Sequence, residues 1–324
     1  MGVFFLPKMY DVIIIGAGIA GLTSAIFSSR QKLETLVISR DLGGQLLMTP
    51  EIQNFPGFMS ISGFDLIVKI EEQARKYGAE ILFDEVTGVD RKGDYFIVKT
   101  LYSSYEALSV ILSFGKIPKD LNIPGERELK GKGVAYCVLC DAPLFRGKTT
   151  ALVGWGEHGL DAVSLLKEYA SKVYWIFPGE KPVSEEAKLS KVLSKGNVIL
   201  VPQSTPSEIR GETKVESILI KNNKLNQIKE LKVDGVFVEI GYVTKTDFVK
   251  NFVELNEKGE IMANEKGETS QSGVFAAGDV TNQPYKQAVI SAASGAIASL
   301  SAYNYVMSLK GRAVSIRSDW KHIT

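Results

Sequence analysis

Residues 10–21 read Y-D-V-I-I-I-G-A-G-I-A-G, a short apolar run that breaks directly into closely spaced glycines. The β-branched run before the first glycine is typical of a parallel strand buried on both faces. In a G-x-G-x-x-G turn, the glycines let the backbone approach a pyrophosphate, toward which the following helix directs its N–H groups. We therefore expect Gly16, Gly18 and Gly21 to bind a dinucleotide, either FAD or NAD. The alternative is a tight turn without a ligand, which the order strand, turn, helix, strand disfavours.

The elements after this turn complete a nucleotide-binding pattern. A helix is expected over 22–29 and a second buried strand over 35–38, which gives a β-α-β unit. The pattern starts again with a strand over 149–153, the glycine turn G-W-G-E-H-G at 154–159 and a helix over 160–169. Two such units predict an α/β fold with two Rossmann-like three-layer nucleotide-binding domains.

The overall composition is that of an ordinary globular protein. Of the 324 residues, 45% are hydrophobic and 23% are charged, and Lys+Arg 38 against Asp+Glu 37 leaves a net charge of +1. Because no basic stripe stands out, nucleic acid and anionic membranes are not expected partners. The first residues lack the basic region of a signal peptide, and no apolar run is long enough to span a membrane. The chain is therefore expected to be cytoplasmic.

The two cysteines, Cys137 and Cys140, form a C-x-x-C pair. A bridge between them would close a tiny loop of little structural value, so redox chemistry explains the pair better than stability does. Two thiols do not complete a zinc shell, and with only His158 and His322 to add, we expect no metal site. Unreactive buried thiols are the alternative. Asp141 follows directly, and a carboxyl whose pKa is raised by an apolar setting can protonate a leaving thiolate.

Five segments together resemble the low-molecular-weight thioredoxin reductases over nearly the whole chain. They are G-G-Q-L at 43–46, E-I-Q-N-F-P-G at 51–57, C-V-L-C-D at 137–141, G-V-F-A-A-G-D-V at 273–280 and Q-A-V at 287–289. Their order and spacing fit the family throughout, which is more specific than a lone glycine motif. The resemblance implies an FAD-dependent disulfide oxidoreductase that forms a homodimer and acts on a thioredoxin-like protein.

The resemblance also implies which residues hold FAD. In the family, the first glycine turn binds this cofactor, and the loop that carries Gln45 and Asn54 here lies along the flavin. The pair Gly278-Asp279 matches the segment that holds the ribityl and phosphate region. The FAD-binding residues implied are Gly16, Gly18, Ala20, Gly21, Ser39, Gly44, Gln45, Leu46, Asn54, Val86, Gly115, Gly278, Asp279, Gln287, Ala288 and Val289.

The domain boundaries follow from the same resemblance. The run at 273–280 must return to the first domain if Asp279 is to reach the first cofactor. The FAD-binding domain is therefore expected to be discontinuous, formed by residues 1–117 and 243–324. The second domain, 118–242, is inserted in it, is of the NAD(P)H-binding type and carries the C-x-x-C pair.

The catalytic roles are also implied by the family. There the second cysteine of the pair lies against the flavin, and the first attacks the substrate disulfide. These roles fall on Cys140 and Cys137, and Asp141 matches the proton donor. Asp141 has an alternative role as the cap of a following helix, which is compatible with the chemistry.

The second glycine turn departs from the family pattern. Relatives place small residues between these glycines, where this chain has Trp155, Glu157 and His158. A carboxylate beside a phosphate is unfavourable by about 1–4 kcal/mol, depending on solvation. The turn is therefore poorly suited to a pyrophosphate.

The strand after this turn lacks the arginines that bind the 2′-phosphate of NADPH in the family. Where NADPH-dependent members have His-Arg-Arg, this chain has Phe177-Pro178-Gly179, and Val183 replaces a further arginine. No acidic residue ends the strand to hold a free 2′-OH, unless Glu180 reaches it. NADPH is therefore not expected to bind, and NADH is less clearly excluded. Loss of the second ligand is favoured over a modified NADH site.

These observations lead to one hypothesis and two alternatives. The leading hypothesis is a thioredoxin reductase-like flavoprotein that receives electrons from a donor other than NADPH, such as reduced ferredoxin. The first alternative is an NAD(P)H-dependent thioredoxin reductase or an NADH oxidase with unusual dinucleotide contacts. The second is a non-catalytic flavin-binding paralogue, against which the intact Cys137, Cys140 and Asp141 argue.

Overall fold

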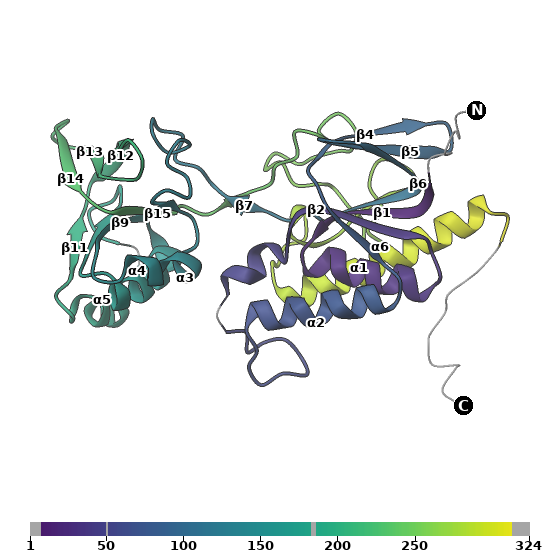
Figure 1. Cartoon of the computed structure of the whole chain (residues 1–324), viewed down its shortest axis with the longest axis horizontal. Coiled ribbons are helices and arrows are strands. Elements are labelled where there is room, and N and C mark those ends of the chain that lie inside the picture. The colour runs from purple at the N-terminus through teal and green to yellow at the C-terminus, as the bar shows by residue number, and fades with distance from the viewer. Residues whose placement is uncertain (1–7, 50, 183–185, 313–324) are drawn as a thin grey trace. The chain divides into compact units, whose positions relative to one another are not determined.

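The computed structural model describes residues 8–49, 51–182 and 186–312 (Figure 1). The chain divides into two compact units. The first is built from two separate parts of the sequence, up to Lys116 and from Thr244 onward, and the second is the continuous stretch Ile117–Val243. Within the described ranges, no helix is both long and apolar enough to cross a membrane.

The first unit contains a seven-stranded sheet. Its strands are β1 (Met9–Ala17), β2 (Thr35–Leu42), β3 (Glu80–Phe83), β4 (Val86–Lys92), β5 (Tyr95–Thr100), β6 (Ser104–Leu112) and β17 (Val274–Ala276). The order is β3-β2-β1-β6-β5-β4, and β17 also pairs with β6. β1, β2, β3, β6 and β17 pair in parallel, whereas β4 and β5 continue from β6 as antiparallel strands. Because β1 and β17 each pair in parallel with β6, the turns that follow them lie at the same edge of the sheet.

Three helices cover one face of this sheet (Figure 1). They are α1 (Ile19–Arg30), α2 (Gly63–Lys76) and α6 (Ala288–Leu309). α1 and α6 approach so closely that a Cβ on Gly295 would lie 2.2 Å from the Ala20 carbonyl oxygen. The Ser24 hydroxyl donates to the Gly295 carbonyl, and the hydroxyls of Ser28 and Ser299 are 2.8 Å apart. Small residues therefore join α6, near the end of the chain, to the first helix.

The opposite face of the sheet is covered by the segment 244–263, from which Val249 and Val253 enter the core. Glu260 of this segment is buried and makes ion pairs with Lys116, at 2.9 Å, and Lys286, at 3.3 Å. Burial alone would raise the pKa of Glu260. Hydrogen bonds from Asn256 and Lys116 and the charge of Lys286 outweigh burial and hold the pKa at about 2.

The second unit repeats the design of the first. Its sheet has the order β11-β10-β9-β15-β8, and all of its pairs are parallel. The strands are β8 (Val134–Ala135), β9 (Thr149–Gly154), β10 (Lys172–Ile176), β11 (Val198–Val201) and β15 (Gly235–Glu239).

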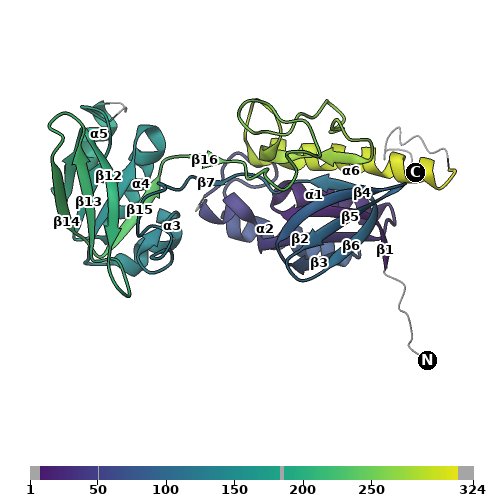
Figure 2. The same ribbon diagram turned by 90° about the horizontal axis from the view of Figure 1, so that it is seen from above.

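Two layers enclose this second sheet (Figure 2). One consists of α3 (Val138–Asp141), α4 (Gly156–Tyr169) and α5 (Glu186–Leu193). The other is an antiparallel sheet of β12 (Ser204–Arg210), β13 (Ser217–Asn222) and β14 (Ile228–Lys232). A short ribbon of β7 (Ile117–Pro118) and β16 (Tyr242–Val243) lies where the chain enters and leaves the unit. Two parallel sheets covered on both faces give the α/β fold class predicted from the sequence.

Candidate functional site

The first glycine turn leaves open space at one glycine and none at the other two. A Cβ on Gly21 would lie 1.8 Å from the Gly16 carbonyl oxygen, and one on Gly16 would lie 2.6 Å from the Ser113 carbonyl oxygen. Gly16 also has a φ of +107°, which favours glycine. At Gly18, in contrast, nothing lies within 4 Å of where a Cβ would be. The backbone is thus exposed beside the N-terminus of α1, where a pyrophosphate can approach.

The Gly278-Asp279 segment lies against this turn. η3 (Gly278–Val280) follows β17, and a Cβ on Gly278 would lie 2.8 Å from the Cβ of Ala20. One carboxylate oxygen of Asp279 accepts a hydrogen bond from the Ser291 hydroxyl at 2.9 Å, and the other accepts from Gln45 Nε2 at 3.2 Å. Residues that are 234 positions apart in the chain therefore meet at one carboxylate.

A second polar contact joins the loop after β2 to the start of α6. Asn54 Nδ2 donates to Gln287 Oε1 at 3.0 Å, and Gln287 is the N-cap residue of α6. Gln45 belongs to η1 (Gly44–Met48), and its Nε2 is 4.0 Å from where a Cβ on Gly115 would be. The structure thus connects Gln45 with Asp279 and Asn54 with Gln287.

The other predicted cofactor residues belong to the same unit. Ser39 lies within β2, Val86 begins β4, and Leu46 of η1 packs against the core that α1, α2 and α6 share. Ala288 and Val289 are the first two residues of α6. Together with the turn and Asp279, these positions fit a long dinucleotide such as FAD.

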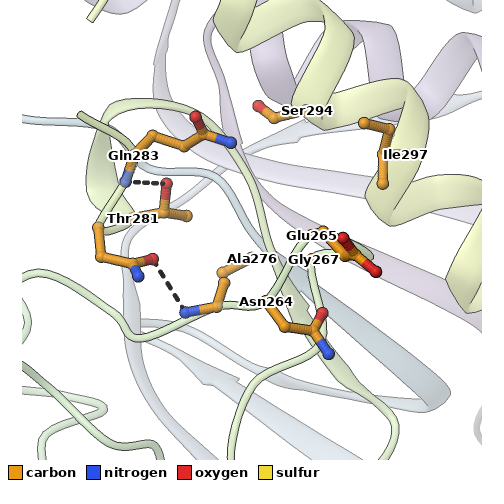
Figure 3. Close-up of a pocket in the computed structure, with 10 residues that line it drawn as sticks. Asn264, Glu265, Gly267, Ala276, Thr281, Gln283, Ser294 and Ile297 are labelled. Carbon is orange, nitrogen blue, oxygen red and sulfur yellow. Dashed lines mark hydrogen bonds between the residues drawn. The ribbon is translucent and has the colours of Figure 1, made fainter. Parts of the chain in front are cut away.

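A small pocket is lined in part by residues that follow Asp279, among them Thr281 and Gln283 (Figure 3). Its volume of about 20 Å³ has room for a single water molecule. Its polar walls are already bonded within the chain, since Thr281 Oγ1 accepts from the Gln283 N–H and Asn282 Oδ1 accepts from the Ala263 N–H. This pocket is therefore too small to be a cofactor site.

The two cysteines form a disulfide in the second unit. Cys137 and Cys140 are bridged with a Cα–Cα distance of 5.3 Å. Cys137 is the N-cap residue of α3, and its Sγ accepts a hydrogen bond from the Cys140 N–H at 3.1 Å. Cys140 is exposed and Cys137 is half-buried, so both sulfur atoms belong to a turn at the surface of the unit.

Asp141 follows the disulfide and is half-buried. Burial raises the pKa of its carboxyl, as a proton donor requires. Asp141 occupies the N-cap position of η2 (Ala142–Phe145), but its side chain makes no capping hydrogen bond there. The carboxyl is therefore not committed to the alternative role of a helix cap.

The second glycine turn carries large and exposed side chains between its glycines. Trp155, Glu157 and His158 are exposed around the start of α4. Phe177, one of the positions at which the resemblance predicted loss of a 2′-phosphate contact, is 1% exposed and packs edge-on against Trp175 with ring centroids 5.6 Å apart. The Glu157 carboxylate is therefore exposed at the turn, and the residue that follows β10 is an aromatic side chain buried in the core.

Four further residues of the second nucleotide site were singled out in the sequence, namely Pro178, Gly179, Glu180 and Val183. Pro178 and Gly179 are exposed, and Val183 lies outside the described residues. The Glu180 carboxylate accepts a hydrogen bond from Gln203 Nε2 at 2.9 Å. The acidic group that could have bound a ribose therefore has a partner within the chain.

One titratable residue of the second unit was not identified from the sequence. Burial raises the pKa of Glu239, the last residue of β15, to about 7, and the neighbouring Val138 N–H lowers it only in part. The one signal in the sequence is a carboxylate that ends the apolar run V-F-V-E. That pattern does not reveal that Val138 lies next to it.

The comparisons with known proteins agree with this geometry. The family model described as pyridine nucleotide-disulphide oxidoreductase matches residues 10–298. This chain belongs to that family. It is 37% identical to a thioredoxin reductase of Bacillus subtilis over 94% of this chain and 96% of the relative.

Solved structures of the family add the fold. The crystal structure of Lactococcus lactis thioredoxin reductase in its FR conformation is similar with a TM-score of 0.80 and 31% identity, over 92% of this chain and 99% of that one. A ferredoxin-flavin thioredoxin reductase from Clostridium acetobutylicum is similar with a TM-score of 0.54 and 33% identity, over 94% and 100%. The predicted resemblance and the predicted pair of Rossmann-like domains are confirmed. The chain is an FAD-dependent disulfide oxidoreductase of the thioredoxin reductase type.

Proposed function

We propose that this enzyme reduces a thioredoxin-like protein through Cys137 and Cys140 and that its electron donor is not NADPH. Reduced ferredoxin is the donor that we favour. The observation that carries the proposal is the second nucleotide site, where Glu157 is exposed at the glycine turn and Phe177, directly after β10, is buried in the core. FAD, when bound, supplies the two-electron chemistry that connects a donor to the disulfide.

The cofactor would be held by the residues of the first unit. Gly18 leaves room for the pyrophosphate, and the N–H groups at the start of α1 point to it. Asp279 would hold the ribityl region, with its carboxylate oriented by Ser291 and Gln45. We assign the first unit as the FAD-binding domain and the second as the NAD(P)H-type domain. The expected boundaries, at 117/118 and 242/243, each differ by one residue from the ends of the compact units.

The dithiol would act in two exchange steps. The Cys137 thiolate attacks one sulfur of the acceptor disulfide, and the other acceptor sulfur leaves as a thiolate that takes a proton, which we assign to Asp141. Cys140 then attacks the Cys137 sulfur of the mixed disulfide. This releases the reduced acceptor and restores the bond between Cys137 and Cys140. The Cys140 N–H donates to Cys137 Sγ and thereby favours the thiolate form of the attacking residue.

NADPH would lack charged contacts at the second nucleotide site. Arginine is absent at Pro178, Gly179 and Val183, and each missing charge-assisted hydrogen bond costs about 1.5–3 kcal/mol. Losing two or three of them weakens affinity by roughly two or more decades, at tenfold per 1.4 kcal/mol. NADH is less affected because it has no 2′-phosphate. The similar ferredoxin-flavin thioredoxin reductase supports ferredoxin as the alternative donor.

The test is to mix the oxidised holoenzyme anaerobically with NADPH, NADH or reduced ferredoxin and to follow bleaching of the flavin spectrum. We expect rapid bleaching with ferredoxin and slow or no bleaching with NADPH. Pro178→Arg should not restore the NADPH reaction, because the turn itself stays obstructed. An NADPH dissociation constant in the low micromolar range, with bleaching in milliseconds, would show an ordinary NADPH-dependent thioredoxin reductase. Bleaching by NADH alone would favour an NADH-dependent enzyme.

The state of assembly is also part of the proposal. We infer from the family that the enzyme is a homodimer in the cytoplasm. Sedimentation of the holoenzyme over a range of concentrations measures the first inference, and a monomer at micromolar concentration would contradict it.

A further inference from the structure

Glu239 lies between the second glycine turn and the disulfide of the same unit. It ends β15, which pairs in parallel with β9 on one side, so that Glu239 is opposite Gly154. On its other side, β15 pairs with β8 through Phe237 and Ala135. Because β8 runs directly toward Cys137, the end of β15 lies next to the turn that carries the disulfide.

The surroundings of Glu239 hold its side chain in place. A Cβ on Gly154 would lie 3.1 Å from the Cβ of Glu239 and 2.7 Å from its carbonyl oxygen, so only glycine fits there. The Glu239 carboxyl faces the Val138 N–H, and Val138 is bonded directly to Cys137. Tyr242 is the other titratable group that interacts with it, and burial together with the Glu239 charge raises the pKa of that phenol above its usual value.

Two N–H groups of the disulfide turn thus have different acceptors. The Cys140 N–H donates to Cys137 Sγ, and the Val138 N–H faces the Glu239 carboxyl. When the disulfide is reduced, a thiolate on Cys137 and a carboxylate on Glu239 would be two negative charges at one short turn, the first on the turn and the second at the end of β15 beside it. Like charges that are close together and partly removed from water oppose each other's ionisation. Two other titratable groups lie nearby. The Tyr242 phenol is neutral near pH 7, and Asp141 carries the carboxyl that belongs to the turn itself.

We propose that Glu239 is a positioning residue that holds the Cys137 turn through Val138 and sets the pH at which the Cys137 thiol ionises. The inference rests on the proposed function, because it takes Cys137 as the thiol that attacks the acceptor. A neutral Glu239 favours the Cys137 thiolate, and a charged Glu239 disfavours it. Proton uptake by this carboxyl thereby prepares the attacking thiol.

The test measures alkylation of Cys137 by iodoacetamide as a function of pH in FAD-loaded, reduced protein. Cys140→Ser is the common background, so that one thiol remains. We expect two steps in the profile, because the thiol and the carboxyl titrate together. Glu239→Gln keeps an oxygen for the Val138 N–H but removes the charge. It should give a single step with its midpoint about one pH unit lower. Its rate should be up to roughly tenfold greater where the wild-type Glu239 is charged, above about pH 7, and equal to wild type well below that pH.

The matched control is Glu212→Gln, which removes a carboxylate from an exposed turn of the same unit and should leave the profile unchanged. A one-step wild-type profile, or a Glu239→Gln profile that superimposes on it, overturns the proposal. The first of these outcomes does not depend on how the variant folds. Alkylation of chemically reduced protein involves neither the electron donor nor thioredoxin, so a wrong donor assignment would leave the result intact.

Discussion

Gly18 and Gly21 belong to the same turn, but alanine should affect them in opposite ways. Gly18 has φ −77° and ψ −177°, which alanine adopts readily, and nothing lies within 4 Å of the added methyl group. Gly18→Ala should therefore fold, and it should stabilise the apoprotein by about 0.4–1 kcal/mol because the unfolded chain loses freedom. At Gly21, the methyl group would lie 1.8 Å from the Gly16 carbonyl oxygen, so the backbone must move. Gly21→Ala should destabilise the apoprotein by about 1–3 kcal/mol.

Although Gly18→Ala should stabilise the apoprotein, it should weaken the binding of FAD. If the pyrophosphate of FAD lies over Gly18, the new methyl group occupies the space that the phosphates need. Loss of one charge-assisted hydrogen bond costs about 1.5–3 kcal/mol, which weakens FAD binding by roughly 10- to 150-fold. Flavin fluorescence titration of the apoprotein measures the affinity, and urea unfolding of the apoprotein measures the stability. If Gly18→Ala binds FAD within about twofold of the wild type, the cofactor does not lie over this turn and the reasoning fails.

Three further predictions concern the disulfide and the buried ion pairs. Asp141→Asn should slow electron transfer from dithionite-reduced enzyme to thioredoxin by about 10- to 100-fold at pH values below the raised pKa of Asp141. Above that pKa, the wild-type rate should itself fall. If stopped-flow rates of the variant equal those of wild type at every pH, Asp141 is not the proton donor. Cys140→Ser should trap thioredoxin in a mixed disulfide with Cys137, seen by mass spectrometry, and trapping by Cys137→Ser instead would exchange the two roles. Because the folded pKa of Glu260 is depressed from 4.5 to about 2, this carboxylate contributes about 3 kcal/mol to the free energy of unfolding above pH 4.5. That contribution is lost as the pH falls toward 2. The difference in melting temperature between wild type and Glu260→Gln should therefore shrink over that range, and a constant difference contradicts the ion-pair account.

The elements predicted best from the sequence are those in which a glycine or an apolar run has a local reason. The strand before Gly16 and the strand before Gly154 both form where they are expected, because short apolar runs that end in a glycine turn suit a parallel sheet buried on both faces. The helix expected from residue 160 begins at Gly156, inside the predicted turn. The antiparallel strands β12 to β14 were not expected, since their residues mix charged and apolar types without a strong period.

The contacts of the candidate site could not be derived from spacing. Nothing in the residues themselves shows that Gln45 contacts Asp279, because that contact depends on how β17 returns to the first sheet. The resemblance to a family supplied those positions, but it gave no role to Glu239. A carboxylate at the end of a strand acquires its altered pKa only from the neighbours that the fold places around it.

The seam between α1 and α6 has a consequence for biosynthesis. Ser24 contacts Gly295, which the ribosome adds 271 residues later, and Asp279 also belongs to this late part of the chain. The second unit is continuous from Ile117 to Val243, so all of its strands have emerged before the first unit has received α6. The first helix and its sheet must therefore wait with an uncovered apolar surface while an entire domain is translated. If FAD lies between Gly18 and Asp279 as proposed, its capture needs both ends of the chain and is among the last events of maturation. A polypeptide that terminates before α6 should then be released without the cofactor.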